Sequence, residues 1–447
     1  MPAPAIPIDL LVEPGWIIPI EPAGLVLENH ALAVDNGRIV ALLPAADARR
    51  TYSPREHVDL PGQVLMPGLV NLHTHAAMAL LRGYADDLPL MRWLNERIWP
   101  AERKFVSPDF VRDGTRLAAW EMLRGGITCF NDMYFFPGAA AEAARDAGIR
   151  AMLGVTVLEF PSSYAADAED YLAKGLAVRD AWRDDPLVSF ALAPHAPYTV
   201  GDLVFERVAT LSAQLDMAIH IHLHETRDEI AESIRQHGVR PLERLHRLGL
   251  LGPNLIAVHA VHMNPQEIDL LARHGCNVAH CPTSNMKLAS GIAPLTSMLD
   301  AGLSVGLGTD GAASNNRLDI LREARQAALL AKVASNDAVV APAHRVLRMA
   351  TLDGAVALGL GDTIGSLLPG KAADLCSIRL DDWPGQPCYD PASHAVHVAG
   401  REQVSHVWVN GRLRICNSMP IGMSPNGLID IAKSWHNPKR LDWPGLP

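Results

Sequence analysis

The stretch "MPGLVNLHTHAAMALLRGYADD", residues 66–87, places two histidines, His73 and His75, at the end of a short apolar run. Residues i and i+2 of a β-strand face the same side, so both imidazoles can point toward one place at the end of such a strand. A single His-x-His pair is weak evidence for a site, because histidines also occur in cores and on surfaces. The pair becomes informative only where other strand ends supply similar side chains.

Short apolar runs rich in β-forming residues alternate with segments of helical period between about residues 68 and 310. This alternation is typical of parallel strands joined by helical crossovers. Helix-like segments include residues 138–149 and 265–275, each with a glycine near its end. Eight strand candidates are present, the number that closes an α/β barrel of the (β/α)8 or TIM type: "GLVNLH" (68–73), "GITCFNDMY" (126–134), "IRAMLGVTV" (149–157), "VSFALAPH" (188–195), "MAIHIHLHE" (217–225), "NLIAVHAVH" (254–262), "CNVAHC" (276–281) and "LSVGLGTD" (303–310). We expect the barrel to occupy residues 67–369.

The two ends of the chain show a different pattern. Residues 31–42, "ALAVDNGRIVAL", and 404–415, "VSHVWVNGRLRI", each place Asn-Gly between alternating apolar residues, the strongest short-range signal for a β-hairpin. A further strand candidate, "GKAADLCSI" (370–378), precedes the second hairpin. We predict that residues 1–66 and 370–447 form one small composite domain, a β-sandwich built from both chain ends.

The composition describes a globular protein that acts on a small molecule. Of 447 residues, 49% are hydrophobic and 20% are charged, and the net charge is −10. An acidic chain argues against a nucleic-acid polymer as partner, because phosphates call for a basic face. The sequence shows no leader-peptide pattern and no run as long as a membrane span, so we expect a cytoplasmic protein without membrane contact. Its six cysteines lack Cys-x-x-Cys spacing, which suits reduced thiols.

Other apolar runs also stop at metal-competent side chains, namely His195, His222, His259 and Asp310. In a barrel of this type the active site forms at the carboxyl ends of the strands. Three imidazoles and a carboxylate fit a borderline-soft cation such as Zn²⁺ and leave one position for water; Fe²⁺ and Mn²⁺ can use the same ligands. The candidate ligands are His73, His75, His222 and Asp310.

The pattern of the run "MAIHIHLHE" (217–225) does not decide which histidine is the metal ligand. His220, His222 and His224 are two residues apart and would all face the same side of the strand. His220 lies deeper in the strand, where a hydrogen-bonded core histidine is the simpler interpretation. His224 is a candidate for a supporting or pocket-lining role. Glu225 follows His222 by three residues, so an acid is placed to reach a water held by the metal.

Five motifs in order carry a resemblance to a known family: "NLHTH" (71–75), "HLHET" (222–226), "AVHAVH" (257–262), "AHCPTSN" (279–285) and "GLGTDGAASNN" (306–316). Together they resemble the metal-dependent amidohydrolase superfamily, in its branch of cytosine, guanine and adenosine-derivative deaminases and triazine chlorohydrolases. Within that branch the chain is most similar to the 5′-methylthioadenosine/S-adenosylhomocysteine deaminases. "GKAADL" (370–375) and "VWVNGR" (407–412) resemble the small β domain of the same family.

The resemblance implies a role for each motif residue. His73, His75, His222 and Asp310 would hold one metal ion, which would supply hydroxide for attack on the amino-bearing carbon of an adenine nucleoside. Glu225 would contact the substrate and carry the proton of the water to the ring nitrogen, and His259 would orient the hydroxide and stabilise the oxygen. Asp310 would pass a second proton to the departing ammonia.

An absence in the fourth strand supports a single metal. Two-metal members of the superfamily usually bridge their metals with a carboxylated lysine there, whereas "VSFALAPHAPYT" (188–199) offers His195 and no lysine. By resemblance, His195 contacts the substrate; the simpler alternative is a structural histidine hydrogen-bonded to its loop. A mononuclear site favours deamination of aromatic rings over hydrolysis of cyclic amides.

The substrate is indicated by fewer residues. Glu102 in "RIWPAERK" (97–104) matches the position where nucleoside-type members bind the ribose, and a carboxylate is suited to accept from two hydroxyls. Trp93 and Trp99 could line an apolar wall beside it. Residues 151–175 contain no arginine for a homocysteine carboxylate, which favours 5′-methylthioadenosine or adenosine over S-adenosylhomocysteine.

Two alternatives stay open from the sequence alone. The first is a guanine or pterin deaminase, or an s-triazine aminohydrolase or chlorohydrolase, that uses the same metal chemistry. The second is a non-catalytic metal-binding protein on the same scaffold, because a fold does not determine a function. Barrels of this type commonly form dimers, so the resemblance also implies a homodimer or higher homo-oligomer.

Overall fold

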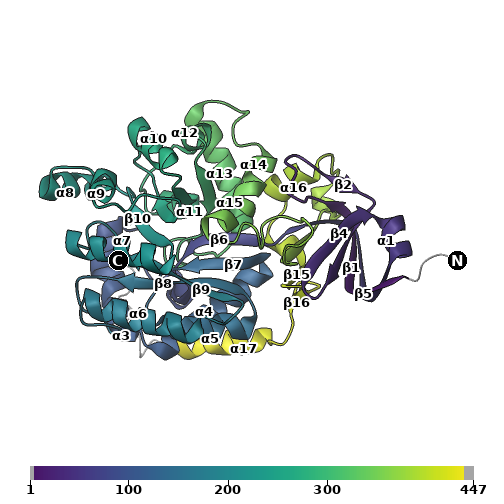
Figure 1. Cartoon of the computed structure of the whole chain (residues 1–447), viewed down its shortest axis with the longest axis horizontal. Coiled ribbons are helices and arrows are strands. Elements are labelled where there is room, and N and C mark those ends of the chain that lie inside the picture. Colours follow the sequence, from purple (N-terminus) through teal and green to yellow (C-terminus); the bar gives the residue numbers. More distant parts are fainter. Residues whose placement is uncertain (1–4, 437–447) are drawn as a thin grey trace.

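The computed structural model describes residues 5–436, and its central feature is a barrel of eight parallel strands (Figure 1). A backbone hydrogen bond of 3.0 Å from the Asp310 N–H to the His73 carbonyl connects the end of the last strand to the first. Each strand overlaps one of the eight predicted runs, so the predicted (β/α)8 fold is confirmed. The strands follow one another in chain order: β6 (Leu69–Thr74), β7 (Ile127–Asp132), β8 (Arg150–Val157), β9 (Val188–Pro194), β10 (Ile219–Leu223), β11 (Leu255–His259), β12 (Asn277–His280) and β13 (Ser304–Leu307).

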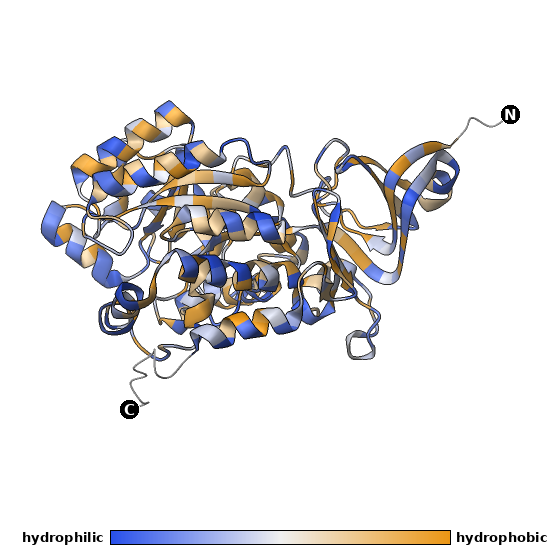
Figure 2. Cartoon of the chain, turned by 90° about the horizontal axis from the view of Figure 1, so that it is seen from below, coloured by the Kyte–Doolittle hydropathy of each residue, from blue (hydrophilic) through white to orange (hydrophobic). Residues whose placement is uncertain are grey.

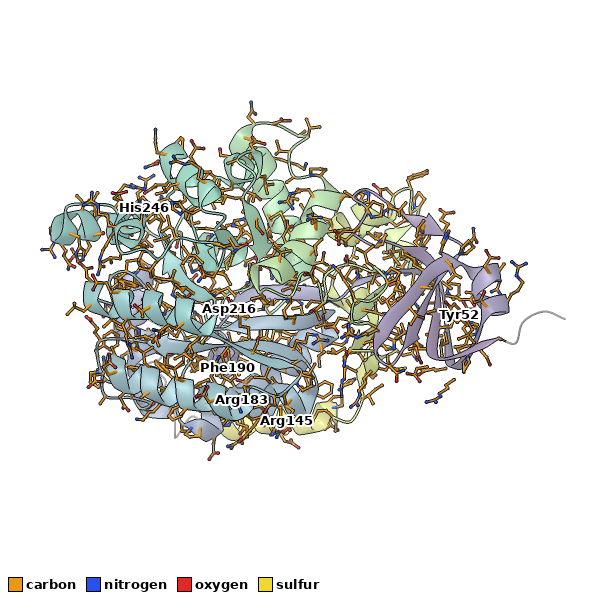
Figure 3. All side chains as sticks on the ribbon, viewed as in Figure 1. Tyr52, Arg145, Arg183, Phe190, Asp216 and His246 are labelled. Atoms are coloured by element: carbon orange, nitrogen blue, oxygen red, sulfur yellow. The ribbon has the colours of Figure 1, made fainter. Side chains whose placement is uncertain are left out.

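Helices cover the outside of the barrel. The helices predicted over residues 138–149 and 265–275 are α5 and α10, and α10 begins with Pro265 after the capping residue Asn264. Figure 2 shows helices that alternate hydrophilic and hydrophobic residues beside mostly hydrophobic strands, and side chains fill the space between these layers (Figure 3). The helices are α4 (Pro108–Arg124), α5 (Pro137–Ala147), α6 (Ala168–Trp182), α7 (Asp202–Leu215), α8 (Arg227–His237), α9 (Pro241–Arg247), α10 (Pro265–Arg273), α11 (Pro282–Lys287), α12 (Leu295–Asp300), α13 (Ile320–Ser335), α14 (Ala343–Met349) and α15 (Leu352–Ala357).

The connection from β6 to α4 forms one wall of the barrel mouth. It contains the short helical segments η1 (Ala76–Leu81), α2 (Leu90–Trp93), η2 (Leu94–Ile98) and α3 (Trp99–Phe105), and η2 is a π-helical turn. Single π-turns inside helices are frequent at functional sites, because the extra residue redirects the side chains that follow. Here the redirected segment is the one that carries Glu102.

A second, mixed sheet contains strands from both ends of the chain (Figure 1). Its joint is an antiparallel pairing of β5 with β14, in which Pro67 lies opposite Leu375. This arrangement confirms that the two ends share one small β structure. Its elements are β1 (Ile6–Ile17), β2 (Leu27–Glu28), β3 (His30–Asp35), β4 (Arg38–Pro44), α1 (Ala45–Thr51), β5 (Tyr52–Pro67), β14 (Leu375–Arg379), β15 (Val404–Val409), β16 (Arg412–Cys416) and β17 (Met419–Pro420).

Both Asn-Gly hairpins are present where the sequence predicts them. Asn36 and Gly37 have φ of 49° and 75°, and Asn410 and Gly411 have φ of 50° and 73°, the left-handed values that a two-residue type I′ turn requires. The two turns meet at Ala373, whose N–H donates to Gly37 and whose carbonyl accepts from Gly411. The hairpin tips from opposite ends of the chain are therefore held together by backbone.

Helices α16 and α17, the last two that the structure describes, pack on helices of the barrel. Helix α16 (Pro391–His397) contacts α13 and α14, whereas α17 (Pro425–Trp435) contacts α4. The Trp435 ring packs edge-on against Phe110, with the ring centres 5.3 Å apart, and its indole N–H donates to Asp113 at 2.9 Å. The division of the chain at residues 66 and 370 stays a prediction.

Two further sequence expectations concern the described residues 5–436. None of the helices there is long and apolar enough to span a bilayer. All six cysteines are free thiols, as their spacing predicts.

A buried ion pair joins the small sheet to the floor of the barrel. The Arg150 guanidinium, at the start of β8, donates to both oxygens of Asp374 at 2.8 and 3.1 Å, and the side chains are 8% and 1% exposed. We expect Asp374→Ala to lower the free energy of unfolding by about 3–5 kcal/mol, because it leaves the Arg150 charge buried without its partner. Denaturant titration at fixed protein and metal concentration measures this loss.

The matched control is Asp47→Ala, which removes an exposed ion pair with Arg50. Because surface pairs contribute little, its cost should stay below about 1 kcal/mol. Equal losses in the two variants would contradict a special role for the buried pair.

Candidate metal centre and catalytic pocket

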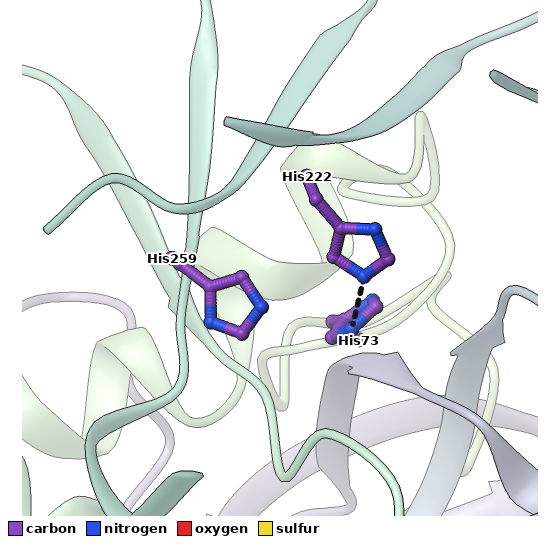
Figure 4. Close-up of side chains that lie close together, drawn as sticks. All are labelled: His73, His222 and His259. Carbon is purple, nitrogen blue, oxygen red and sulfur yellow. Dashed lines mark hydrogen bonds between the residues drawn. The ribbon is translucent and has the colours of Figure 1, made fainter. Parts of the chain in front are cut away.

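The four predicted ligands converge at the carboxyl ends of the barrel strands. His73 and His75 come from the end of β6, His222 from β10, and Asp310 from the turn after β13. Asp310 Oδ1 lies 3.2 Å from Nε2 of both His73 and His75, and His222 Nε2 lies 3.3 Å from His73 Nε2. Figure 4 shows the His73 and His222 rings meeting at this point, with the His259 ring facing it.

The hydrogen bonds behind these rings determine which nitrogens face one another. His75 Nδ1 lies 2.6 Å from the Met133 carbonyl and His222 Nδ1 lies 2.8 Å from the His195 carbonyl. A carbonyl can only accept, so each Nδ1 carries the hydrogen and each Nε2 presents a lone pair. Lone pairs and a carboxylate that point at one place repel one another unless a cation lies between them, so this donor set fits a metal ion.

The Asp310 carboxylate is held by several donors. Its Oδ2 accepts from the Ser284 hydroxyl at 2.6 Å and from the Ser314 hydroxyl at 2.7 Å, and its Oδ1 accepts from the Gly311 N–H at 2.8 Å. Burial raises the pKa of Asp310, but the neighbouring His73 and His75 outweigh this effect and hold the pKa well below its usual range. Asp310 is therefore an anion with a fixed orientation.

Glu225 and His259 lie next to the metal-ligand cluster, as the resemblance implies. His259 Nε2 is 3.8 Å from Glu225 Oε2, and the Ser290 hydroxyl donates to Glu225 Oε1 at 3.4 Å. Glu225 is 5% exposed, and burial raises the pKa of its carboxyl. A raised pKa lies closer to neutral pH, so the carboxyl can both take up and release a proton under working conditions. The other nitrogen of His259, Nδ1, is 2.9 Å from Asn285 Oδ1.

Three residues at these strand ends adopt left-handed backbone conformations that non-glycine residues rarely adopt. The φ angles are 55° at His224, 71° at His259 and 59° at Asp310. Such strain concentrates at functional sites, where the surrounding structure holds it in place.

The three histidines of residues 217–225 have separate roles. His222 points into the cluster, whereas Nε2 of the buried His220 lies 2.9 Å from His73 Nδ1 and supports that ring from behind. His224 lies beyond the end of β10, and its ring turns away from the cluster, where its Nε2 accepts from the Leu242 N–H at 3.1 Å. The core interpretation of His220 is confirmed, and the pocket-lining interpretation of His224 is wrong.

A pocket of about 1040 Å³, its open mouth included, extends outward from the cluster. His195 and Glu225 line its floor, and Trp93, Trp99 and Glu102 line its wall. All five are residues that the sequence singled out for the substrate. The structure therefore brings the predicted substrate residues and the predicted ligands into one cavity.

Burial shifts the pKa values of the two predicted substrate contacts, Glu102 and His195, in opposite directions. It raises the pKa of Glu102 to about 7, against the lowering effects of Tyr134 and His75, and it lowers the pKa of His195 to about 3. His195 is therefore a neutral imidazole at physiological pH. Its Nδ1 lies 3.2 Å from the Thr199 hydroxyl, which orients the ring toward His222 with the ring centres 4.8 Å apart.

Several residues of the site were missed by sequence reasoning. Ser284, Asn285 and Ser314 support Asp310 and His259, although they belong to the quoted motifs "AHCPTSN" and "GLGTDGAASNN". Residues 151–175 offer no arginine for a homocysteine carboxylate, but Arg103 from α3 also lines the pocket. Its position directly after Glu102 was the available signal.

Comparisons with known proteins identify the family of this chain. The amidohydrolase family model matches residues 64–414. A 5-methylthioadenosine/S-adenosylhomocysteine deaminase of Teredinibacter turnerae is 47% identical over 404 residues, which cover 90% of this chain and 91% of the relative. A relative of the same name from Saccharophagus degradans is 45% identical and covers 96% of both chains.

Two solved structures share the fold. An adenosine deaminase from Xanthomonas campestris with bound zinc superposes with a TM-score of 0.96 at 50% identity, over 97% of this chain and 98% of the other. An atrazine chlorohydrolase from Arthrobacter aurescens complexed with zinc gives 0.88 at 27% identity, over 95% and 99% of the chains. With matches of this identity and coverage, the chain belongs to the amidohydrolase family.

Proposed function

We propose that this protein hydrolytically deaminates an adenine nucleoside, giving the inosine derivative and ammonia. The observation that carries the proposal is the placement of Glu225 and His259 beside the cluster of His73, Asp310 and their neighbours, in one pocket with Glu102 and His195. The relatives named for adenine-nucleoside deamination support the same activity. 5′-Methylthioadenosine and adenosine are the preferred substrates.

His73, His75, His222 and Asp310 would hold one metal ion. Three imidazole nitrogens and one carboxylate oxygen suit zinc, and zinc is bound in the Xanthomonas campestris structure. When bound, the ion lowers the pKa of water to about 7 and so makes hydroxide available at neutral pH.

The side chains of this chain move the protons. Glu225 takes one proton from the attacking water and delivers it to the ring nitrogen next to the amino-bearing carbon, which makes that carbon electrophilic. The new carbon–oxygen bond forms beside His259, which orients the oxygen and stabilises it. Asp310 takes the second proton and passes it to the amino group, and the carbon–nitrogen bond breaks to release ammonia.

Product formation on a panel of substrates tests the proposal. Zinc-reconstituted protein is assayed with 5′-methylthioadenosine, adenosine, S-adenosylhomocysteine, adenine and guanine, and the ultraviolet change reports deamination. Fast turnover of the two uncharged nucleosides is expected. If metal-loaded protein forms no product from any nucleoside, the result would contradict the proposal and favour guanine, pterins or s-triazines as substrates. If it forms no product from any aromatic amine, the result would favour a non-catalytic protein.

The variant Arg103→Ala is assayed on the same panel of substrates. The Arg103 guanidinium could contact the carboxylate of S-adenosylhomocysteine, so its effect separates the charged substrate from the uncharged ones. If S-adenosylhomocysteine turnover is slow and is the same in Arg103→Ala as in the wild type, then Arg103 does not bind the homocysteine carboxylate.

Glu102 is proposed to accept hydrogen bonds from the ribose hydroxyls. We expect Glu102→Ala to lower kcat/KM for nucleosides by about 100-fold, since two hydrogen bonds to a charged group are lost, while turnover of free adenine stays unchanged. Glu96→Ala, in the same segment but exposed and paired with Arg92, is the control and should match the wild type. A parallel loss on adenine would rule out a ribose-specific role.

A further inference from the structure

The turn that carries Glu225 is held by a buried carboxylate four residues further on. Glu229, in the first turn of α8, accepts hydrogen bonds from two consecutive backbone N–H groups: that of His224 at 2.9 Å and that of Glu225 at 2.8 Å. Glu229 is only 7% exposed. Its own N–H donates to the hydroxyl of Thr226, the capping residue of α8. One carboxylate therefore ties the start of α8 to the peptide groups at the end of β10.

This arrangement differs from an ordinary capping box. In a capping box the glutamate at the third helical position accepts from the N–H of the capping residue itself. Helix α10 shows that form, where Glu267 accepts from the Asn264 N–H at 2.9 Å. In α8 the glutamate at the same position reaches past Thr226 to the two residues before it. Its hydrogen bonds thus hold Glu225 in addition to the helix end.

The backbone at this point needs support. His224 has a φ of 55°, a conformation that persists in a non-glycine residue only where neighbouring groups hold it. Because of this turn, the His224 ring points toward Leu242, and the Glu225 side chain points into the pocket, 3.8 Å from His259. Rotation of the peptide between His224 and Glu225 would move the Glu225 carboxylate out of reach.

We propose that Glu229 is a positioning residue that fixes the Glu225 carboxylate for proton transfer. The inference rests on the proposed function, in which Glu225 carries the proton. Glu229 itself neither lines the pocket nor belongs to the predicted metal ligands, and its carboxylate reaches Glu225 through the backbone N–H groups of the turn. Small displacements of a catalytic group are costly, because proton transfer requires close approach.

Glu229→Gln tests the proposal with a side chain of the same size. The glutamine N–H₂ cannot accept a hydrogen bond, so one of the two backbone N–H groups loses its partner. On zinc-reconstituted, full-length protein we expect kcat for 5′-methylthioadenosine to fall by about 10–100-fold. KM should stay within about threefold, and the zinc content should not change. Glu232→Gln, on the same helix but partly exposed and paired with Arg235, should equal the wild type.

A double variant separates positioning from general damage. If Glu229 acts through Glu225, then Glu225→Gln with Glu229→Gln is no slower than Glu225→Gln alone, because the geometry of an inactive group no longer matters. Multiplicative losses, lost zinc or an unchanged kcat in Glu229→Gln would each overturn the proposal.

Thr226→Ala provides a second variant that leaves the Glu229 carboxylate intact. It removes the oxygen that caps the Glu229 N–H, so a kcat loss of a few-fold is expected, again absent in the Glu225→Gln background. Failure of the proposed function is distinguishable, because it shows as an inactive wild type or a fully active Glu225→Gln.

Discussion

Replacement of Glu225 by Gln is expected to lower kcat for adenine-nucleoside deamination by about 10³-fold while the protein keeps its metal. The amide preserves the size of the side chain and its contact with Ser290 but cannot take a proton from water. Because Glu225 is not among the predicted ligands, metal analysis should give the same content as the wild type. KM should change little, since the loss lies in the chemical step.

Glu206→Gln is a suitable control, because Glu206 is exposed on α7 and belongs to none of the motifs. Near-normal rates in metal-replete Glu225→Gln would remove Glu225 from the mechanism. A loss of metal in this variant would instead place the carboxylate among the ligands.

The second large effect concerns the metal. His222→Ala should reduce zinc affinity by more than about 100-fold, because changes to groups that merely support a ligand already cost 10–100-fold. Turnover should fall to background at substoichiometric zinc. Equilibrium dialysis against a competing chelator measures the affinity, and excess zinc should restore little activity. His246→Ala, at a partly exposed ring on α9 (Figure 3), should bind zinc as the wild type does.

His259→Ala distinguishes two ligand sets. The structure allows a metal between His73, His222 and His259 as well as one between His73, His75 and Asp310. We expect His259→Ala to retain zinc and lose turnover, because His259 acts on the oxygen. Loss of zinc in His259→Ala with retention in His75→Ala would assign the first set.

The barrel could be predicted because each of its strands lies in a short run rich in apolar residues, and helix-like segments separate these runs. The same logic located the ligands, since the carboxyl ends of parallel strands meet on one side of the barrel. The hairpins were predictable from Asn36-Gly37 and Asn410-Gly411, because few other dipeptides tolerate two positive φ angles.

The period-two pattern of residues 217–225 could not indicate which of its three histidines is the metal ligand. His220, His222 and His224 alternate in phase, but the strand ends at Leu223 and the next residue turns into the left-handed region. A pattern of period two cannot indicate where the extended conformation stops. Only the surrounding turn, with Glu229 as acceptor, determines that His224 leaves the site.

The residues that support the site are equally hard to read from one sequence. Ser284 and Ser314 resemble ordinary turn or helix-start residues, and their contact with Asp310 exists only after α11 and β13 are packed together. Likewise, nothing in the pattern around residues 391–435 indicates that α16 and α17 cross to the barrel, because amphipathic helices do not specify their partner.

The pairing of β5 with β14 has a consequence for synthesis of the chain. Pro67 leaves the ribosome about 300 residues before its partner Leu375. At roughly 5–20 residues per second, the β5 edge stays unpaired for tens of seconds, and open strand edges are the surfaces through which nascent chains associate wrongly. The β5 edge of the nascent chain therefore stays unpaired while the whole barrel is synthesised. It can pair within the chain only after β14 has left the ribosome.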